Sequence, residues 1–121
     1  MELTGVIVTS PFFFKVGRDK LKLHLSKIAE GVNLPIIVCN IPATTGINVP
    51  IDLYVELTRE YSNIVGAKAT HDSLTYFRKL IYNVKSIRKD FTVLTGINDL
   101  PLPVLMMGGD GGIMALANVA P

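Results

Sequence analysis

Short apolar runs alternate along the chain with longer segments in which apolar residues recur every three or four positions. The apolar runs occupy residues 5–9, 34–39, 63–68, 91–95 and 112–116. Several of them are rich in β-branched residues and almost continuous in apolar character. Such runs are typical of buried strands in a parallel sheet that is covered on both faces. The pattern therefore predicts five strands.

The segments between these runs have helical periodicity. Apolar residues at helical spacing predict helices over 19–32, 51–61, 74–81 and 98–107, whereas 40–46 is predicted to be a loop. Strands and helices that alternate in this way, with short connections, are typical of an α/β protein with right-handed crossovers between parallel strands. Two architectures fit this order: an open doubly wound sheet, and an arc of a (β/α)8 barrel.

The third apolar run ends on a lysine, Lys68, and a helical pattern follows at once. In a parallel α/β protein the C-terminal end of a strand is where catalytic groups are placed. A lysine at this position has two interpretations. It is either a solvated surface residue, which is the commoner case, or an amine whose pKa is lowered by apolar neighbours so that it attacks a carbonyl and forms a Schiff base. Position alone does not decide between them.

Composition and charge exclude several classes of protein. The chain has 121 residues, 49% of them hydrophobic and 18% charged, which predicts one globular domain without disordered segments. A net charge of +2 from scattered residues argues against nucleic-acid binding. Cys39 is the one cysteine, which excludes an intrachain disulfide and favours a cytoplasmic setting. The sequence shows neither a signal peptide nor an apolar run of the roughly 18 residues needed to cross a membrane.

Two local segments have competing interpretations. The glycine-rich segment 108–112 resembles a phosphate-binding loop, but such loops run from a strand into a helix, and here the order is reversed. We therefore predict a structural turn on the N-terminal side of the sheet. Phe12, Phe13 and Phe14 are either core residues or one wall of a pocket, and we favour the core. Spacings typical of a zinc site, a dinucleotide fingerprint or a carboxylate pair do not occur.

Five segments, taken together, resemble the pyruvate-dependent class I aldolases, which include dihydrodipicolinate synthase, N-acetylneuraminate lyase and 2-keto-3-deoxygluconate aldolase. Segment 8–15 is similar to the family's Thr-Pro-Tyr-Tyr, 39–46 to Tyr-Asn-x-Pro-x-x-Thr-Gly, 66–68 to Gly-x-Lys, 95–98 to Ser-Gly-Asp-Asp, and 108–113 with 117–121 to the last barrel strand. No single motif is decisive. Their shared order and spacing are specific, and they extend over essentially the whole chain.

The resemblance implies a (β/α)8 barrel, of which this chain would supply strands four to eight as one partial domain, residues 1–121. The first three βα units and the C-terminal helical region of the family would be absent. The absent part carries, in the family, a Gly-Thr-Thr-Gly-like loop that holds the substrate carboxylate. An arc of five strands cannot close as an eight-stranded barrel does. Its open edges are expected to pair with other chains, so we expect instability, rearrangement or a homo-oligomer.

The resemblance also implies a lyase. Lys68 would form the Schiff base with pyruvate or another 2-keto acid, and no metal or organic cofactor would be required. Gly96 and Ile113 would line the site, and Thr45 would lie near it in the loop that follows the second strand. The expected partner is a small-molecule substrate rather than a nucleic acid or a membrane.

Departures from the family pattern bear on activity. Cys39 and Phe13 stand where the family has tyrosines, so both phenol hydroxyls are missing; general acid–base help of this kind typically contributes about 10²–10⁴ in rate. Thr44 stands where dihydrodipicolinate synthases carry an arginine. The absence of this arginine favours a 2-keto-3-deoxy sugar acid as the substrate. An inactive remnant that serves as an interaction module is therefore the alternative to a working aldolase.

Overall fold

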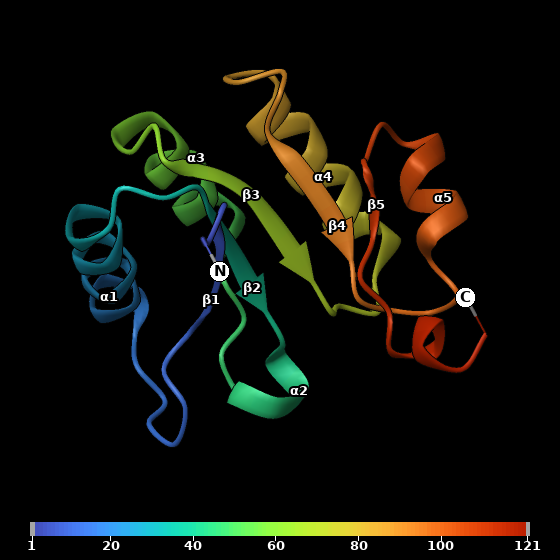
Figure 1. Cartoon of the computed structure of the whole chain (residues 1–121), viewed down its shortest axis with the longest axis horizontal. Helices are drawn as coiled ribbons and strands as arrows, with labels where there is room; N and C mark the ends of the chain where they lie inside the picture. The colour runs from blue at the N-terminus through green and yellow to red at the C-terminus, as the bar shows by residue number, and fades with distance from the viewer. Residues whose placement is uncertain (1, 121) are drawn as a thin grey trace.

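The protein, described by a computed structural model over residues 2–120, is built on one five-stranded parallel sheet (Figure 1). The strands are β1 (Val6–Thr9), β2 (Ile36–Asn40), β3 (Ile64–Ala69), β4 (Thr92–Thr95) and β5 (Gly111–Gly112). They lie in the sheet in the order in which they occur along the chain, and every neighbouring pair is parallel. All C-terminal strand ends therefore meet at one edge of the sheet.

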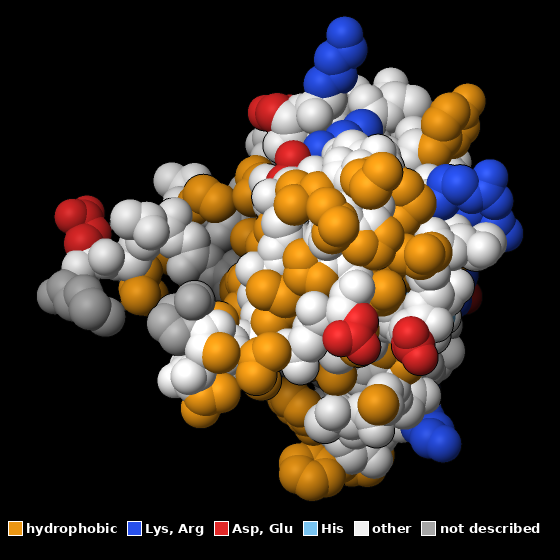
Figure 2. Space-filling model, turned by 90° about the vertical axis from the view of Figure 1, so that its right-hand side faces the viewer, with side chains coloured by type: hydrophobic (Ala, Val, Ile, Leu, Met, Phe, Trp, Pro, Cys, Tyr) orange, Lys and Arg blue, Asp and Glu red, His pale blue; other side chains and the backbone are white. Residues whose placement is uncertain are grey.

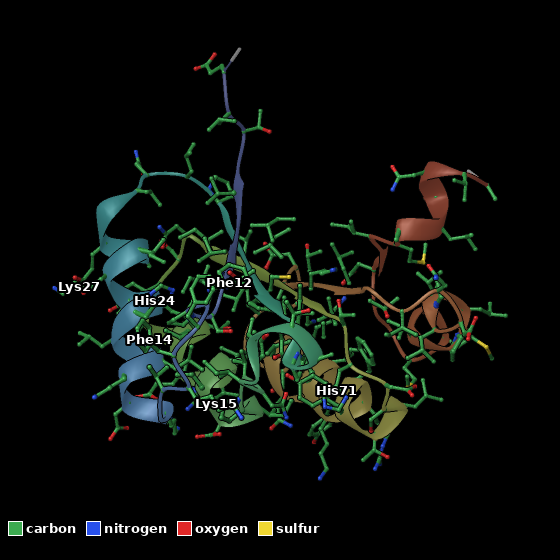
Figure 3. All side chains as sticks on the ribbon, turned by 90° about the horizontal axis from the view of Figure 1, so that it is seen from below. Phe12, Phe14, Lys15, His24, Lys27 and His71 are labelled. Atoms are coloured by element: carbon green, nitrogen blue, oxygen red, sulfur yellow. The ribbon has the colours of Figure 1, made fainter. Side chains whose placement is uncertain are left out.

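Helices fill the crossovers between these strands. They are α1 (Arg18–Gly31), α3 (Ile51–Glu60), α4 (Leu74–Lys85) and α5 (Pro101–Met106). A short helix, α2 (Pro42–Thr45), follows β2, and a 3₁₀ turn, η1 (Ala115–Asn118), follows β5. The four crossover helices lie on one side of the curved sheet (Figures 1 and 3). A doubly wound sheet has helices on both faces and a strand order that reverses. Sequential order with helices on one side is the arrangement of a barrel arc, so the first of the two architectures is excluded.

The hydrophobic core lies between the sheet and these helices. Val38, Ala67 and Val93 are fully buried on the strands, and Leu57 and Phe77 are fully buried on the helices. The opposite face of the sheet is more open. Ile7 on β1 is 50% exposed, and Val65 on β3 and Leu94 on β4 are partly exposed. The prediction of strands covered on both faces is therefore wrong for the described residues.

The first four predicted strands are confirmed to within two residues, but the fifth is not. Residues 112–116 were expected to be extended, whereas β5 ends at Gly112 and the 3₁₀ turn begins at Ala115. The physical reason lies in composition. Met, Ala and Leu prefer helical backbone, and the segment contains one β-branched residue, Ile113.

Two loops also differ from expectation. The predicted loop 40–46 contains α2, in which Pro42 opens the first turn and Gly46 closes the last with a left-handed φ of 68°. Pro supplies the fixed φ that suits a first turn, and Gly adopts the left-handed conformation without steric cost. Phe12, Phe13 and Phe14 are 51%, 100% and 74% exposed, so their assignment to the core is wrong.

The glycine-rich segment is a turn between α5 and β5, as predicted. Gly108 and Gly111 have positive φ values of 90° and 144°, which glycine tolerates best. The carboxylate of Asp110 accepts a hydrogen bond from the Val93 backbone N–H at 2.8 Å and forms an ion pair with Lys85 at 2.8 Å. These contacts fix the turn at the N-terminal edge of the sheet.

None of the described helices is both long and apolar enough to cross a bilayer.

Candidate functional site

Lys68 lies near the C-terminal end of β3, on the same rung of the sheet as Cys39 of β2 and Leu94 of β4. Partners on one rung of a parallel sheet point to the same side, so all three side chains lie on the open face. Lys68 is partly buried, and its Nζ donates a hydrogen bond to Thr70 Oγ1 at 3.0 Å. Figure 3 views the molecule from the edge at which this site lies. The sequence prediction of a strand that delivers Lys68 to this edge is confirmed.

Gly96 follows β4 and leaves room for the amine. Its N–H donates to the Ala69 carbonyl at 2.8 Å, which places it directly beside the end of β3. A Cβ at this position would overlap Thr70 Oγ1 and would lie 2.7 Å from Lys68 Cε and 2.8 Å from Nζ. Contacts this short do not occur in folded proteins. Glycine is therefore required here for space, because the lysine tip occupies the volume that a methyl group would take.

Cys39 contributes a buried, neutral group beside the amine. Its side chain is 4% exposed. Burial raises the pKa of the Cys39 thiol, and the positive charge of Lys68 opposes that shift. A thiol with a raised pKa stays protonated near neutral pH. Cys39 therefore brings a weak hydrogen-bond donor to the rung of Lys68 and no negative charge.

Thr45 lies in the loop that follows β2, where its hydroxyl is used by the loop itself. The hydroxyl lies within hydrogen-bond reach of the Ile41 and Ile47 carbonyls, at 3.1 and 3.2 Å, and accepts from the Ile47 N–H at 3.2 Å. The side chain is buried, so Thr45 stabilises the loop that follows β2, and its place in the site stays a prediction.

In the part of the chain that the structure describes, two predicted site residues, Phe13 and Ile113, do not lie against Lys68. The ring of Phe13 is fully exposed, on a backbone with φ of 68°. Ile113 directly follows β5, where its N–H donates to the Thr95 carbonyl at 2.9 Å and its side chain is 47% exposed. Ile113 thus stands at the correct edge of the sheet, two strands from Lys68.

Sequence reasoning missed Thr70, which is the hydrogen-bond partner of the amine. The signal was present, because residues two apart on a strand point to the same side, and Thr70 follows Lys68 by two. Asn40 and Tyr76 were also missed. Their side chains form a buried hydrogen bond across 36 positions of sequence, a separation over which periodicity carries no information.

The arrangement joins a primary amine, a hydroxyl and a neutral thiol at the end of parallel strands, with apolar residues around them. Such an amine is suited to attack on a carbonyl carbon. Within residues 2–120, groups of three or more His, Cys, Asp or Glu side chains that could hold a metal do not occur.

Comparison with known proteins agrees with this geometry. The model of the dihydrodipicolinate synthetase family matches residues 2–121. A DapA-like lyase of Thermofilum pendens, itself described as uncharacterised, is 68% identical over 117 residues, which cover 97% of this chain and 39% of that protein. The putative 2-dehydro-3-deoxy-D-gluconate aldolase YagE of Escherichia coli is 38% identical, with coverage of 97% and 39%.

Solved structures show the same relationship. The crystal structure of YagE from E. coli K12 in complex with pyruvate superposes with a TM-score of 0.94 and 38% identity, over 98% of this chain and 40% of that one. The 4-hydroxy-tetrahydrodipicolinate synthase of Methylacidiphilum fumariolicum gives a TM-score of 0.92 at 30% identity, over 98% and 39%. The chain thus spans about two fifths of the length of these relatives. It belongs to the dihydrodipicolinate synthetase family, and its sheet is part of a (β/α)8 barrel.

Proposed function

We propose that the chain carries the Schiff-base lysine of a lyase that forms or cleaves a carbon–carbon bond of a 2-keto acid, with pyruvate as one component. The observation that carries the proposal is the setting of Lys68. Its amine lies at the C-terminal edge of the sheet, 3.0 Å from the Thr70 hydroxyl and in the space left by Gly96. The pyruvate complex of YagE, which shares this fold, supports the proposed substrate component.

In the proposed cleavage, the neutral Lys68 amine attacks the keto carbon of the substrate, and loss of water gives an iminium ion. The bond between C3 and C4 then breaks. Its electron pair moves into the iminium to form an enamine, while the C4 hydroxyl loses its proton and leaves as an aldehyde. Protonation of the enamine at C3 and attack of water release pyruvate and the free amine. The iminium ion formed from the amine is the electron sink, so the chemistry requires no metal or organic cofactor.

We place the substrate among the 2-keto-3-deoxy sugar acids rather than the dicarboxylate precursors. Thr44, exposed at the end of α2, offers no positive charge where the synthases of this family carry an arginine. The similarity to YagE, named as a putative aldolase of a 2-keto-3-deoxy sugar acid, points in the same direction. The lone buried cysteine is compatible with a cytoplasmic setting.

The second candidate is a catalytically inactive chain that acts as an interaction module. The observations that favour it are the thiol of Cys39 and the exposed ring of Phe13, which replace two phenol hydroxyls. If only the acid–base help of these groups is lost, turnover falls by about 10²–10⁴ but the Schiff base still forms. Slow turnover with an intact Schiff base therefore separates the first candidate from the second.

Release of pyruvate from 2-keto-3-deoxygluconate by the full chain tests the proposal. We expect slow release that falls to the uncatalysed level in Lys68→Arg, because a guanidinium does not form the iminium. Lys89→Arg makes the same change at an exposed lysine outside the site and should leave the rate unchanged. Equal rates above the uncatalysed level for Lys68→Arg and the unmodified chain would contradict the assignment, whereas no release by any of the three proteins would favour the inactive module.

A further inference from the structure

A buried polar network joins three elements behind the site. The Asn40 amide nitrogen donates to Tyr76 Oη at 2.9 Å and to Asn48 Oδ1 at 2.9 Å, while its oxygen accepts from the Val49 N–H at 3.1 Å. Tyr76 Oη in turn donates to the Val49 carbonyl at 2.9 Å. We call Asn40, Tyr76 and Val49 the polar joint. It ties the end of β2 to the loop after α2 and to the first turn of α4.

The joint is buried and its polar groups are paired. Asn40 and Val49 are fully buried, and Tyr76 is 9% exposed. Burial raises the pKa of Tyr76 to about 12, so its hydroxyl keeps its proton and its donor role at neutral pH. A buried network of this kind rigidifies the elements that it connects, and loss of one member leaves another unpaired in a medium of low dielectric.

Two contacts connect the joint to the residue that holds the amine. The Asn40 carbonyl accepts from the Thr70 N–H at 2.8 Å, which ends the pairing of β2 with β3. The Tyr76 ring stacks on His71, the next residue, with ring centroids 4.2 Å apart and planes 3° from parallel. In the turn that starts at Thr70, Asn40 thus holds the Thr70 backbone and Tyr76 holds the His71 side chain.

The same turn is closed at its other end. Ser73 caps α4, because its hydroxyl accepts from the Tyr76 N–H at 3.3 Å. Residues 70–73 therefore begin and end on groups of the joint, and Thr70 has little freedom to move its hydroxyl away from Lys68. Because that hydroxyl accepts the hydrogen bond from Lys68 Nζ, a shift of the turn also shifts the preferred position of the amine.

We propose that Asn40 and Tyr76 are positioning residues, which hold Thr70 and through it the Lys68 amine in the orientation needed to attack the substrate carbonyl. This inference rests on the proposed function and extends it to residues outside the site. Neither side chain touches the amine, so each acts through Thr70. Removal of the Tyr76 hydroxyl should leave the fold in place and loosen the turn.

The first test is the amide hydrogen exchange of Thr70 in the full chain, which needs no substrate. In Tyr76→Phe the ring stack is kept and two hydrogen bonds are lost, so we expect exchange of the Thr70 N–H to rise about five- to thirtyfold, the range that corresponds to one to two lost net hydrogen bonds. Tyr82→Phe is the matched control, because it lies on the same helix with a side chain that is 76% exposed. Equal exchange in the two variants would overturn the inference.

The second test measures the rate at which borohydride traps pyruvate on Lys68, at a temperature at which circular dichroism shows both variants folded. We expect Tyr76→Phe to trap about ten to a hundred times more slowly at saturating pyruvate, the scale of a small misplacement of reacting groups. Thr70→Val removes the hydroxyl through which the joint acts. In that background Tyr76→Phe should have no further effect, since residues that act in series are not additive.

The outcomes separate the two proposals. Independent, multiplying effects of Thr70→Val and Tyr76→Phe would overturn the positioning role and leave the Schiff base in place. If the unmodified chain traps no pyruvate, the proposed function fails, and the exchange of Thr70 still decides whether the joint holds the turn. Should Tyr76→Phe not fold, Asn48→Ala removes only the outer partner of Asn40, and faster Thr70 exchange in that variant is the expected result.

Discussion

Gly96 is the residue whose identity is most tightly constrained by the site. The atoms that a Cβ would meet there belong to Thr70 and to the tip of Lys68. The Thr70 hydroxyl is the nearer of the two, so a methyl group must displace both this hydroxyl and the amine that it binds. A methyl group at this position therefore acts on the orientation of the amine as well as on stability.

We therefore predict that Gly96→Ala lowers both the reactivity of Lys68 and the stability of the fold. We expect the rate of adduct formation on Lys68 to fall by about 10², because a displacement of the order of 1 Å has effects of that size. The free energy of unfolding, measured with urea, should fall by about 1–3 kcal/mol, the range for adding a methyl group where neighbouring atoms already fill the space. Gly31→Ala is the control, because nothing lies within 4 Å of its Cβ position. An unchanged rate in Gly96→Ala would contradict the geometry of the site.

At this scale the sequence identified Lys68 because an apolar run ends on it, and the resemblance to the aldolases indicated Gly96. It did not identify the reason for the glycine. The side chains of Lys68 and Thr70 lie against the Gly96 backbone only when β3 and β4 pair in register, and that pairing depends on tertiary structure. The joint of Asn40 with Tyr76 has the same origin.

In the turn from α3 to β3, the side chain of Arg88 binds several backbone carbonyls. Its guanidinium donates to the Thr58 carbonyl at 2.6 Å and to the Ile64 carbonyl at 2.8 Å. It donates further to the Tyr61 and Ser62 carbonyls at 3.1 and 3.0 Å. The planar fork of arginine satisfies carbonyls on both sides of the turn, which a lysine ammonium cannot reproduce.

We therefore expect Arg88→Lys to lower the free energy of unfolding by about 1–3 kcal/mol, the range for lost hydrogen bonds to a charged group. Urea denaturation followed by circular dichroism measures the change. Arg59→Lys is the control, because it makes the same substitution at an exposed position on α3. Its free energy of unfolding should lie within about 0.5 kcal/mol of that of the unmodified chain. Similar midpoints for the two variants would show that the turn does not depend on the fork.

The elements themselves were largely predictable, because β2 and β3 are long apolar runs and α3 and α4 have a strong helical period. The failures have local causes. Residues 112–116 are apolar, but their composition favours a helical turn over a strand, and the structure turns there. Phe12–Phe14 were assigned to the core on hydrophobicity alone, although a loop beyond the strand end does not reach the core.

Besides the exposed rings of Phe12, Phe13 and Phe14, two further surfaces of the described residues are apolar. Figure 2 shows hydrophobic side chains gathered on the side that carries α5, where Leu102, Leu105 and Met106 are 69%, 49% and 81% exposed. The second surface is the open face of the sheet, with Ile7 on its edge strand. Contiguous apolar patches and uncovered strand edges mark association sites.

We expect the full chain to self-associate at micromolar concentrations through the α5 side. Sedimentation velocity should show a mass that rises with concentration, and Met106→Glu should shift it toward the monomer because a charge is placed in the apolar patch. Leu23→Glu, at an exposed apolar position on α1, is the control and should leave the mass unchanged. A monodisperse monomer that melts cooperatively would contradict the expectation of an oligomer.

The central claim is that the Lys68 amine is free, correctly placed and reactive toward a 2-keto acid. The most direct measurement is the intact mass of the full chain after incubation with pyruvate and borohydride, followed by peptide mapping. We predict one reduced pyruvyl group, located on Lys68 and absent from Lys68→Arg. A folded sample that gains no such group, or gains it on another lysine, would contradict the Schiff-base assignment and leave this chain with the family's fold and without its chemistry.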